Sequence, residues 1–351
     1  MVTASVFIAL SVITMGHAGV VLDGTLGRSG PLTGPNYMIN ADLGKQVGGN
    51  LFHSFSSFNI TRTESAIFRG PGAVENIISR VTGGSSSTID GLLKSEIQGA
   101  NLYLLNPAGV MFGPNASLDI SGSFHVSTAD YLKLGQDGFF YATTPEKSVL
   151  TTAPPSAFGF LGSNPTGISL EKSVLKVPVG KGISFIGGDM FLHNGSLRAL
   201  GGRIDVVSVA SPGEVQVNDG PPVLNGFAKQ GNVQVLRDVA FTTYADLDVS
   251  GTLQDKNGGV YIRGGRFEMC GGSIYANNTG SYDGRGVNIG VTGDVVLSTQ
   301  GLSMGGLILS RTSGTGKAGD VAVYAKRLEL TGGSYIDTRN SSSGSGGNID
   351  I

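Results

Sequence analysis

The sequence contains no Trp, a single Cys and only four His among its 351 residues, and charged residues make up 14% of it. The lone Cys270 excludes an internal disulfide framework and a Cys-based zinc site. Lys and Arg are scattered and the formal net charge is −2, so binding to nucleic acid through phosphate neutralisation is not expected. Beyond the N-terminal stretch no segment reaches the roughly 18 apolar residues of a transmembrane helix, so no membrane span is predicted.

Glycine is abundant, with 57 residues, and hydrophobic residues make up 40% of the chain. A disordered chain would carry more charge and fewer apolar residues, and a collagen would place Gly at every third position. Gly, Asn and Ser are the residues that form tight corners between short strands. The composition therefore predicts a folded all-β protein.

The sequence repeats itself from residue 231 onward. Units open at Gly231, Gly259, Gly286, Gly319 and Gly347, spaced by about 28, 27, 33 and 28 residues, which is within the range of solenoid repeats. Each unit shows three short runs of alternating apolar and polar residues separated by Gly-containing corners. A single coil cannot bury its inward side chains, so successive coils must stack and pair their strands in parallel. The repeats therefore predict a parallel β-helix.

The chain divides into four predicted segments: a signal peptide at 1–18, a first block at 19–135, a continuation of the β-helix with loop insertions at 136–230, and repeats of about 28 residues at 231–351. The signal peptide rests on the apolar or small residues from Val2 to Met15, followed by a small-residue cleavage site. An ordinary buried N-terminal strand is the alternative. No cofactor is expected.

Two interruptions break the strand pattern in the continuation segment. Residues 137–155 predict a loop or a hairpin outside the helix, and residues 211–222 carry Gly and Pro that end the strand pattern. The best helix candidate, residues 73–80, contains a β-branched run and is equally well predicted as a strand. The last unit stops in the middle of a coil at Ile351, so we expect a fragment of a longer repeat protein, or a partner that covers that end.

Two motifs in the first block resemble a known family. The first is the run from Gly99 to Gly113, with Leu118 to Phe124 after it, and its central residues are Asn106, Pro107, Ala108, Gly109, Val110 and Gly113. The second motif comprises Asn50, Leu51, Phe52, His53, Ser54, Phe55 and Phe58. Both are similar to the N-terminal two-partner secretion domain (haemagglutination activity domain) of filamentous haemagglutinin-type exoproteins with following repeats. The family usually has Asn where this chain has Ala108, which weakens that one position.

The resemblance implies a fold and a route of export. The expected fold is a single-stranded right-handed parallel β-helix of the pectin-lyase-like kind, with an N-terminal cap. The expected protein is an adhesin, or haemagglutinin-like, exoprotein of a Gram-negative-type bacterium, cyanobacteria included. It passes through the periplasm, is recognised there by the periplasmic domains of an outer-membrane β-barrel transporter, and is secreted to the cell surface. A host or cell-surface glycan or protein is a further expected partner.

The Asn106-Pro107 pair has its own physical interpretation. Pro fixes φ and keeps the preceding residue out of the α region, and an Asn side chain can bond the nearby backbone. The motif is therefore either a turn that stabilises the first coils or a direct contact for the transporter, and these two roles are compatible. No enzyme is predicted.

The catalytic alternative is a polysaccharide-binding or polysaccharide-cleaving β-helix, which would need convergent carboxylates on one face. The chain offers isolated carboxylates that we expect on solvated strand faces and in turns, namely Asp205, Asp246, Asp248 and Asp294. Scattered tyrosines that could stack on sugars are expected to be ordinary packing: Tyr103, Tyr244, Tyr261, Tyr275 and Tyr324. The histidines His17, His53, His125 and His193 lack metal-ligand spacing, and we expect His53 to be a core or capping residue with its hydrogen bonds satisfied.

Overall fold

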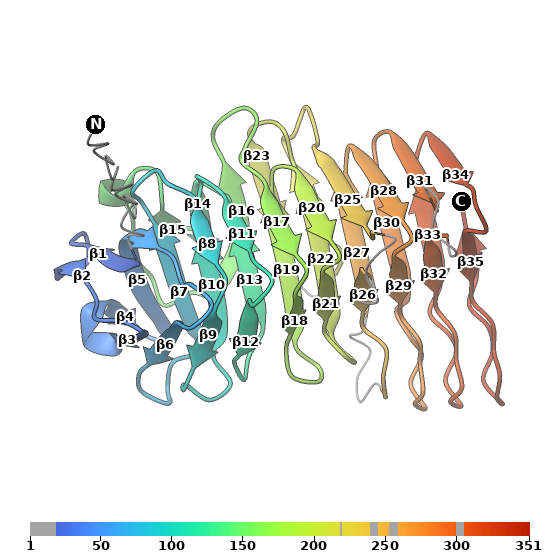
Figure 1. Cartoon of the computed structure of the whole chain (residues 1–351), viewed down its shortest axis with the longest axis horizontal. Helices are drawn as coiled ribbons and strands as arrows, with labels where there is room; N and C mark the ends of the chain where they lie inside the picture. Colours follow the sequence, from blue (N-terminus) through green and yellow to red (C-terminus); the bar gives the residue numbers. More distant parts are fainter. Residues whose placement is uncertain (1–18, 218–219, 239–244, 253–258, 300–304) are drawn as a thin grey trace, which may run out of the picture.

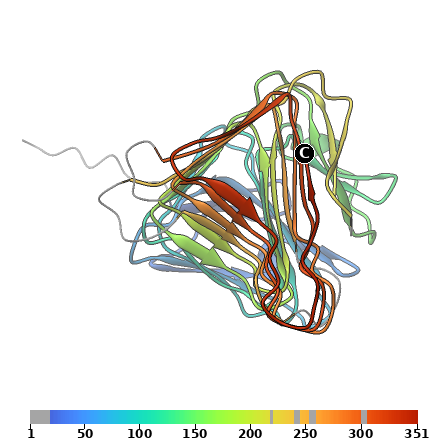
Figure 2. The ribbon, with the colours of Figure 1, turned by 90° about the vertical axis from the view of Figure 1, so that its right-hand side faces the viewer.

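A computed structural model describes residues 19–217, 220–238, 245–252, 259–299 and 305–351. The predicted signal peptide lies outside these residues, as does Tyr244. The chain winds into successive coils whose strands stack along the long axis of the molecule (Figure 1). Seen from the end, the coils superpose into a three-sided section (Figure 2). The prediction of an all-β parallel β-helix is confirmed.

Face 1 is the largest sheet, with 13 strands. It consists of β1 (Val20–Asp23), β2 (Ser29–Pro31), β4 (Lys45–Val47), β5 (Asn50–Phe58), β7 (Asn76–Val81), β10 (Asn101–Leu105), β13 (Phe124–Ser127), β19 (Gly182–Gly187), β22 (Arg203–Ser208), β27 (Gly259–Gly264), β30 (Val287–Val291), β33 (Val321–Tyr324) and β36 (Ile349–Asp350). Strands β1 and β4 run antiparallel to β5, and β2 runs antiparallel to β1. They cover the first coil and form the expected N-terminal cap.

Face 2 and face 3 complete each coil. Face 2 has eight strands, β8 (Ser87–Ile89), β11 (Val110–Phe112), β17 (Ile168–Glu171), β20 (Met190–His193), β25 (Asn232–Leu236), β28 (Arg266–Cys270), β31 (Asp294–Ser298) and β34 (Arg327–Leu330). Face 3 begins with a four-stranded sheet, β3 (Asn36–Asn40), β6 (Ser65–Arg69), β9 (Leu92–Ser95) and β12 (Ser117–Asp119). It continues with a six-stranded sheet, β18 (Val174–Lys176), β21 (Ser196–Arg198), β26 (Asp246–Asp248), β29 (Ser273–Tyr275), β32 (Leu307–Leu309) and β35 (Tyr335–Asp337).

Alternation along each strand sends every second side chain into the helix. Equivalent positions in successive coils pair in register and build one apolar column on face 1: Leu51, Ile77, Leu102, Phe124, Ile183, Ile204, Val260, Val287 and Val321. All of these side chains are at most 1% exposed. Their contacts with the inward residues of the other two faces form the inner core, and burial of this apolar area is the main force that holds the coils together.

The corners explain part of the glycine content. Gly83 lies between β7 and β8, where the chain passes directly over the coil below. A Cβ at Gly83 would overlap the backbone carbonyl oxygen of Ser56. Because that oxygen belongs to the main chain, it cannot move aside, so only glycine fits this corner.

The predicted phase of the first repeat unit is wrong. Four of the units, at Gly259, Gly286, Gly319 and Gly347, lead into strands of face 1, but the unit at Gly231 leads into β25 on face 2. Strand β25 pairs with β20 and β28, whereas β27 pairs with β22. Strands on both faces begin near a glycine and then alternate in the same way, so the spacing alone placed the unit on the wrong face. The helix candidate at 73–80 contributes to strand β7 instead.

The two interruptions join into one antiparallel sheet outside the helix. This outer sheet contains β14 (Tyr131–Leu134), β15 (Gly138–Tyr141), β16 (Pro155–Phe160), β23 (Gly213–Gln216) and β24 (Val223–Asn225). It stands to one side of the three-sided section (Figure 2). A hairpin, one of the two alternatives predicted for 137–155, is present, but it consists of β14 and β15 and therefore begins at Tyr131, before the predicted segment. Its pairing with the second interruption, through β16 and β23, was not predicted. Two 3-10 turns, η1 (Ala41–Leu43) and η2 (Pro145–Lys147), are the helical elements of the described residues.

The outer sheet packs on the outward side of face 1 and creates a second core. Phe158 and Phe140 from the outer sheet meet Phe52, Tyr103 and other outward residues of face 1. Both phenylalanines of the outer sheet are 0% exposed. Face 1 is therefore covered on both sides in its first half, which matches strands such as β7, all of whose residues are buried.

Candidate functional site

The Asn106 motif forms the corner between β10 and β11. Asn106 is fully buried, and its side-chain Nδ2 donates to the Ser85 carbonyl oxygen at 3.0 Å and to Ser87 Oγ at 2.9 Å. Its Oδ1 accepts the Ala108 N–H at 2.9 Å. Ala108 keeps a negative φ, so the turn is of type I rather than type II. The Asn106 side chain thus ties this corner to the coil below.

The other motif residues shape the turn and start β11. The Gly109 N–H donates to the Asn106 carbonyl oxygen at 3.0 Å, and Gly109 has a φ of +110°, which favours glycine. Val110 is 3% exposed and points into the inner core. A Cβ at Gly113 would lie 2.5 Å from Asp90 Oδ1, so a larger residue does not fit there without a shift.

Only part of the motif is accessible to a partner. Pro107 and Ala108 are half-buried, and Met111 is 41% exposed. Ala108 and Met111 border a shallow groove of about 330 Å³ on face 2, whose apolar lining includes Met111, Ile168 and Phe191. The surface that a partner can touch is therefore the turn and Met111, while Asn106 holds that surface in place from within.

The second motif begins with a ladder of asparagines. Asn50, Asn76 and Asn101 are register partners in β5, β7 and β10. The Asn76 amide donates to Asn50 Oδ1 and the Asn101 amide to Asn76 Oδ1, each at 3.0 Å. Asn50 Nδ2 donates to the carbonyl oxygens of Thr151 and Ala153, which lie between the hairpin and β16. This ladder was not predicted, although the three Asn recur at the spacing of one coil.

The apolar residues of the second motif divide between the two cores. Leu51, Phe55 and Phe58 belong to the inner core, whereas Phe52 belongs to the core under the outer sheet. Phe55 and Phe58 form an edge-to-face pair with ring centroids 5.0 Å apart. Ser54 is 2% exposed and takes part in the cluster around Arg80. The motif therefore fixes the first complete coil and attaches the outer sheet to it.

His53 is buried as expected, but its hydrogen bonds are not satisfied as predicted. The ring is 0% exposed and lies near Phe55 and Phe68. Within the described residues neither ring nitrogen has a hydrogen-bond partner. Burial lowers the pKa of His53 to about 3, so the ring is neutral at physiological pH. The ring therefore packs as an apolar side chain among aromatic neighbours.

Arg80 joins three parts of the structure. It is 1% exposed, and its Nε donates to Ser54 Oγ at 2.7 Å in β5. Its Nη2 donates to Thr25 Oγ1 at 2.9 Å in the cap, and its Nη1 donates to Ser148 Oγ at 2.7 Å in the hairpin region. The guanidinium also lies 4.2 Å from the centroid of the Phe140 ring. A lone Arg in a strand pattern carries no sequence signal for this role.

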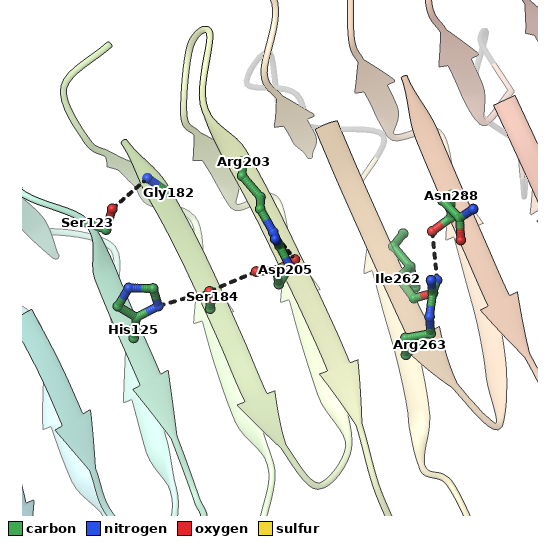
Figure 3. Close-up of polar contacts among 9 residues, drawn as sticks. All are labelled: Ser123, His125, Gly182, Ser184, Arg203, Asp205, Ile262, Arg263 and Asn288. Atoms are coloured by element: carbon green, nitrogen blue, oxygen red, sulfur yellow. Dashed lines mark hydrogen bonds and ion pairs between the residues drawn. The ribbon is translucent and has the colours of Figure 1, made fainter. Parts of the chain in front are cut away.

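A row of polar side chains runs across the outward side of face 1, beside the outer sheet. His125, Ser184 and Asp205 are register partners in β13, β19 and β22 and point toward one another (Figure 3). His125 Nδ1 lies 3.0 Å from Ser184 Oγ, and Ser184 Oγ donates to Asp205 Oδ2 at 3.1 Å. Arg203 Nε donates to Asp205 Oδ1 at 2.7 Å. We call these four residues the polar row.

The prediction that the isolated carboxylates are solvated is wrong for two of them. Asp205 is 4% and Asp246 is 6% exposed. Burial raises the pKa of Asp205 despite the opposing charge of Arg203, and burial raises the pKa of Asp246 to about 6. Alternation correctly placed both residues on outward positions, but it does not tell whether another element covers that side. Asp294 pairs with Arg327 at 3.0 Å, near the surface as expected.

The tyrosines mostly serve packing, as expected. Tyr103 and Tyr261 are each 7% exposed, whereas Tyr324 is 54% exposed. The Tyr103 ring stacks on His125 with centroids 4.4 Å apart, and Arg203 lies 4.8 Å from the centroid of Tyr261. Among the described residues, no group of three or more His, Cys, Asp or Glu side chains could hold a metal ion. In the same part of the chain, no helix has the length and apolar character to cross a membrane.

Residues 18–223 match the family model of the TPS secretion domain. The chain belongs to this family. The match includes both motifs, the polar row, the outer-sheet strands β14, β15, β16 and β23, and the cap. TPS domains belong to haemagglutinin-like exoproteins that are exported by two-partner secretion, and residues 18–223 of this chain match such a domain. Membership of this family implies an outer-membrane transporter as partner, and TPS exoproteins are secreted to the cell surface or extracellular space of Gram-negative bacteria.

Three known proteins resemble this TPS domain. The heme/hemopexin-binding protein of Haemophilus influenzae (strain KW20) is 33% identical over 82 residues, which are 23% of this chain and 9% of that protein. The crystal structure of the HMW1 secretion domain from Haemophilus influenzae aligns with 93% of this chain and 98% of that chain, at 14% identity and a TM-score of 0.45. The filamentous hemagglutinin secretion domain aligns with 95% of this chain and 100% of that chain, at 15% identity and a TM-score of 0.49.

His193 gives this TPS domain a pH-dependent contact on face 2. Its Nδ1 lies 3.1 Å from Glu171 Oε2 and its Nε2 lies 2.9 Å from Asp238 Oδ1. Burial alone would lower the pKa of His193, but hydrogen bonds to Asp238 and Glu171 outweigh it and raise the pKa above the ordinary 6.5. The stabilisation is therefore fully present below pH 6.5 and is lost as the pH rises through the folded-state pKa.

We expect His193→Gln to lower the stability of the domain more at pH 5.5 than at pH 8.5. The difference should be about 1 kcal/mol or less, because the pair is partly exposed to solvent. Urea unfolding of both proteins at the two pH values measures it. His125→Gln is a control of opposite sign: because burial lowers the pKa of His125 to about 3, protonation of the unfolded state costs the wild type stability below pH 6.5, so this variant should lower stability less at pH 5.5 than at pH 8.5. An equal loss at both pH values for His193→Gln would contradict the prediction.

Proposed function

We propose that the transporter recognises the Asn106 turn and the groove beside it, through its periplasmic domains. The observation that supports this proposal is that some residues of the motif are buried and others are accessible. Asn106 is buried and holds the corner, whereas Pro107, Ala108 and Met111 reach the surface. Exposed large apolar side chains beside a groove are characteristic of protein contacts. Asn106 then acts as a positioning residue, and both roles inferred from the sequence apply.

The proposal is tested by export from cells that also contain the transporter. Met111→Asp places a charge in the groove without touching the inner core, and we expect export to fall by about tenfold, equivalent to ~1.4 kcal/mol of binding. The double variant Asn106→Ala/Pro107→Ala should abolish export. Val179→Asp is the matched control, because Val179 is 71% exposed in a corner between β18 and β19, on another part of the surface.

Secreted and periplasmic protein are quantified in parallel for each variant. Circular dichroism of the purified proteins must show that Met111→Asp keeps the fold. Unchanged export of folded Met111→Asp would show that the transporter does not recognise the groove. Unchanged export of the double variant would show that it does not recognise the turn either.

We further propose that the exported protein is an adhesin-like exoprotein that binds a host or cell-surface glycan or protein and has no catalytic activity. The support is the family itself, whose members are secretion domains of adhesin-type exoproteins. One relative is named a heme/hemopexin-binding protein, so its name describes binding and not catalysis. Residues 1–18 would then act as the signal peptide, and a cyanobacterial source fits the proposal. The expected division at residues 135 and 230 remains a prediction.

A further inference from the structure

We propose that the pocket on the outward side of face 1, around the polar row, binds one unit of an acidic sugar. This role is separate from recognition by the transporter, because the pocket lies on face 1 and the Asn106 groove lies on face 2. The pocket measures about 300 Å³, at the small end of the range for ligand sites. It therefore suits a ligand the size of a monosaccharide.

The walls of the pocket come from two sheets. Its floor is the outward side of β13, β19 and β22, which carry His125, Ser184 and Asp205. The outer sheet contributes the rim, through Pro155 at the start of β16 and Val217 just after β23. The covering of face 1 by the outer sheet is thus incomplete at this point, and a polar recess remains beside the second core.

The lack of a side chain at Gly182 keeps the recess open. Ser123, Gly182, Arg203 and Gly259 occupy equivalent outward positions in successive coils. A Cβ at Gly182 would lie 3.4 Å from the Arg203 carbonyl oxygen, 3.8 Å from Ser123 Oγ and 3.9 Å from Arg203 Cβ, all ordinary contact distances, and the φ of Gly182 is not in the left-handed region. A side chain is therefore sterically allowed at Gly182 and would project into the pocket.

The charges of the pocket favour an anion. Arg203 and Arg285 both line it, and Asp205 is the one carboxylate among its lining residues. Arg203 neutralises Asp205 through the 2.7 Å bond, and the cation of Arg263 also acts on Asp205 from the next strand. The lining thus carries two guanidinium groups and one carboxylate, and a third guanidinium, that of Arg263, lies on the next strand. Guanidinium is the group best suited to bind a carboxylate or sulfate through paired N–H donors.

The uncharged groups of the pocket suit sugar hydroxyls. Because the Ser184 hydroxyl donates to Asp205, the hydrogen between His125 Nδ1 and Ser184 Oγ comes from the His125 N–H. Burial lowers the pKa of His125 to about 3, so the ring is neutral. Its Nε2 therefore carries a lone pair and can accept a hydrogen bond from a sugar hydroxyl. Ser123 Oγ, which accepts the Gly182 N–H at 2.9 Å (Figure 3), remains able to donate. An inorganic anion would use the arginines and leave these groups unused.

Isothermal titration calorimetry of the full-length exported protein tests the proposal. The probes are galacturonate, glucuronate and N-acetylneuraminate, with galactose as the uncharged sugar and sulfate as the anion without a sugar. We expect binding of at least one acidic sugar, and binding of galactose and sulfate at least about tenfold weaker, a difference of ~1.4 kcal/mol. No binding of any acidic sugar, or equally tight binding of sulfate, would overturn the proposal.

Two variants place the binding in the pocket. Gly182→Val should fill the recess and Arg285→Gln should remove a cation, and each should weaken binding of the acidic sugar at least about tenfold. Gly162→Val is the matched control, because a Cβ at Gly162 meets nothing within 4 Å and Gly162 does not line the pocket. Binding that survives Gly182→Val in a folded protein would overturn the proposal. Export is measured separately and should be normal for all three variants.

Discussion

Replacement of Arg80 by Met is expected to destabilise the N-terminal half of the protein by about 3 kcal/mol, because several buried hydrogen bonds to a charged group are lost and each is worth roughly 1.5–3 kcal/mol. Burial lowers the pKa of Arg80 to about 10, with Asp23 and Glu146 opposing the change, so the side chain is charged at neutral pH. Its neighbour Ser54 donates to Asp23 Oδ2 at 2.6 Å. The variant leaves this buried network without its cation.

The loss should be local to the three parts that Arg80 joins. Hydrogen exchange should become faster in the cap strands β1 and β2 and in the hairpin strands β14 and β15, while β27 and β30 keep their protection. Arg69→Met is the matched control, because Arg69 pairs with Glu96 at 2.7 Å on the exposed surface, where such pairs contribute little. Unchanged protection of the cap and the hairpin in Arg80→Met would show that apolar packing alone holds them.

The sequence predicted what repeats locally and missed what depends on contacts between distant residues. Alternation and glycine corners are properties of short segments, so the β-helix, the turn at Asn106 and an interruption of the helix near 137–155 were all predictable. The pairing of β16 with β23 joins Phe158 to Val215, and no local pattern encodes such a distant partner. The error at Gly231 has a similar cause, since successive faces of one coil share the same short pattern.

The candidate site was predictable only where a motif marked it. The Asn106 turn carried a family signal, but the pattern did not show that Asn106 itself is buried. Asp205 was correctly placed on an outward position, yet its burial depends on the outer sheet and on Arg203. Polar residues on a covered outward face therefore need the tertiary structure to be recognised, because alternation distinguishes inward from outward and not covered from solvated.

Phe158→Ala should detach the outer sheet while the β-helix stays folded. Phe158 is 0% exposed and lies in the second core, with its ring centroid 6.5 Å from that of Tyr103. Truncation of a buried Phe costs about 3–5 kcal/mol, and here the cost falls on a sheet that contacts the helix mainly through this core. Hydrogen exchange should accelerate in β14, β16 and β23, and the protection of β10 and β13 should persist.

Phe185→Ala is the matched comparison, because Phe185 is equally buried but packs in the inner core, 5.5 Å from the ring centroid of Phe112. That variant should lower protection in β11 and β19 rather than in the outer sheet. If both variants loosened the same strands, the two cores would form one cooperative unit. If they act separately, Phe158→Ala should also weaken binding of an acidic sugar, since Pro155 and Val217 of the pocket rim depend on the outer sheet.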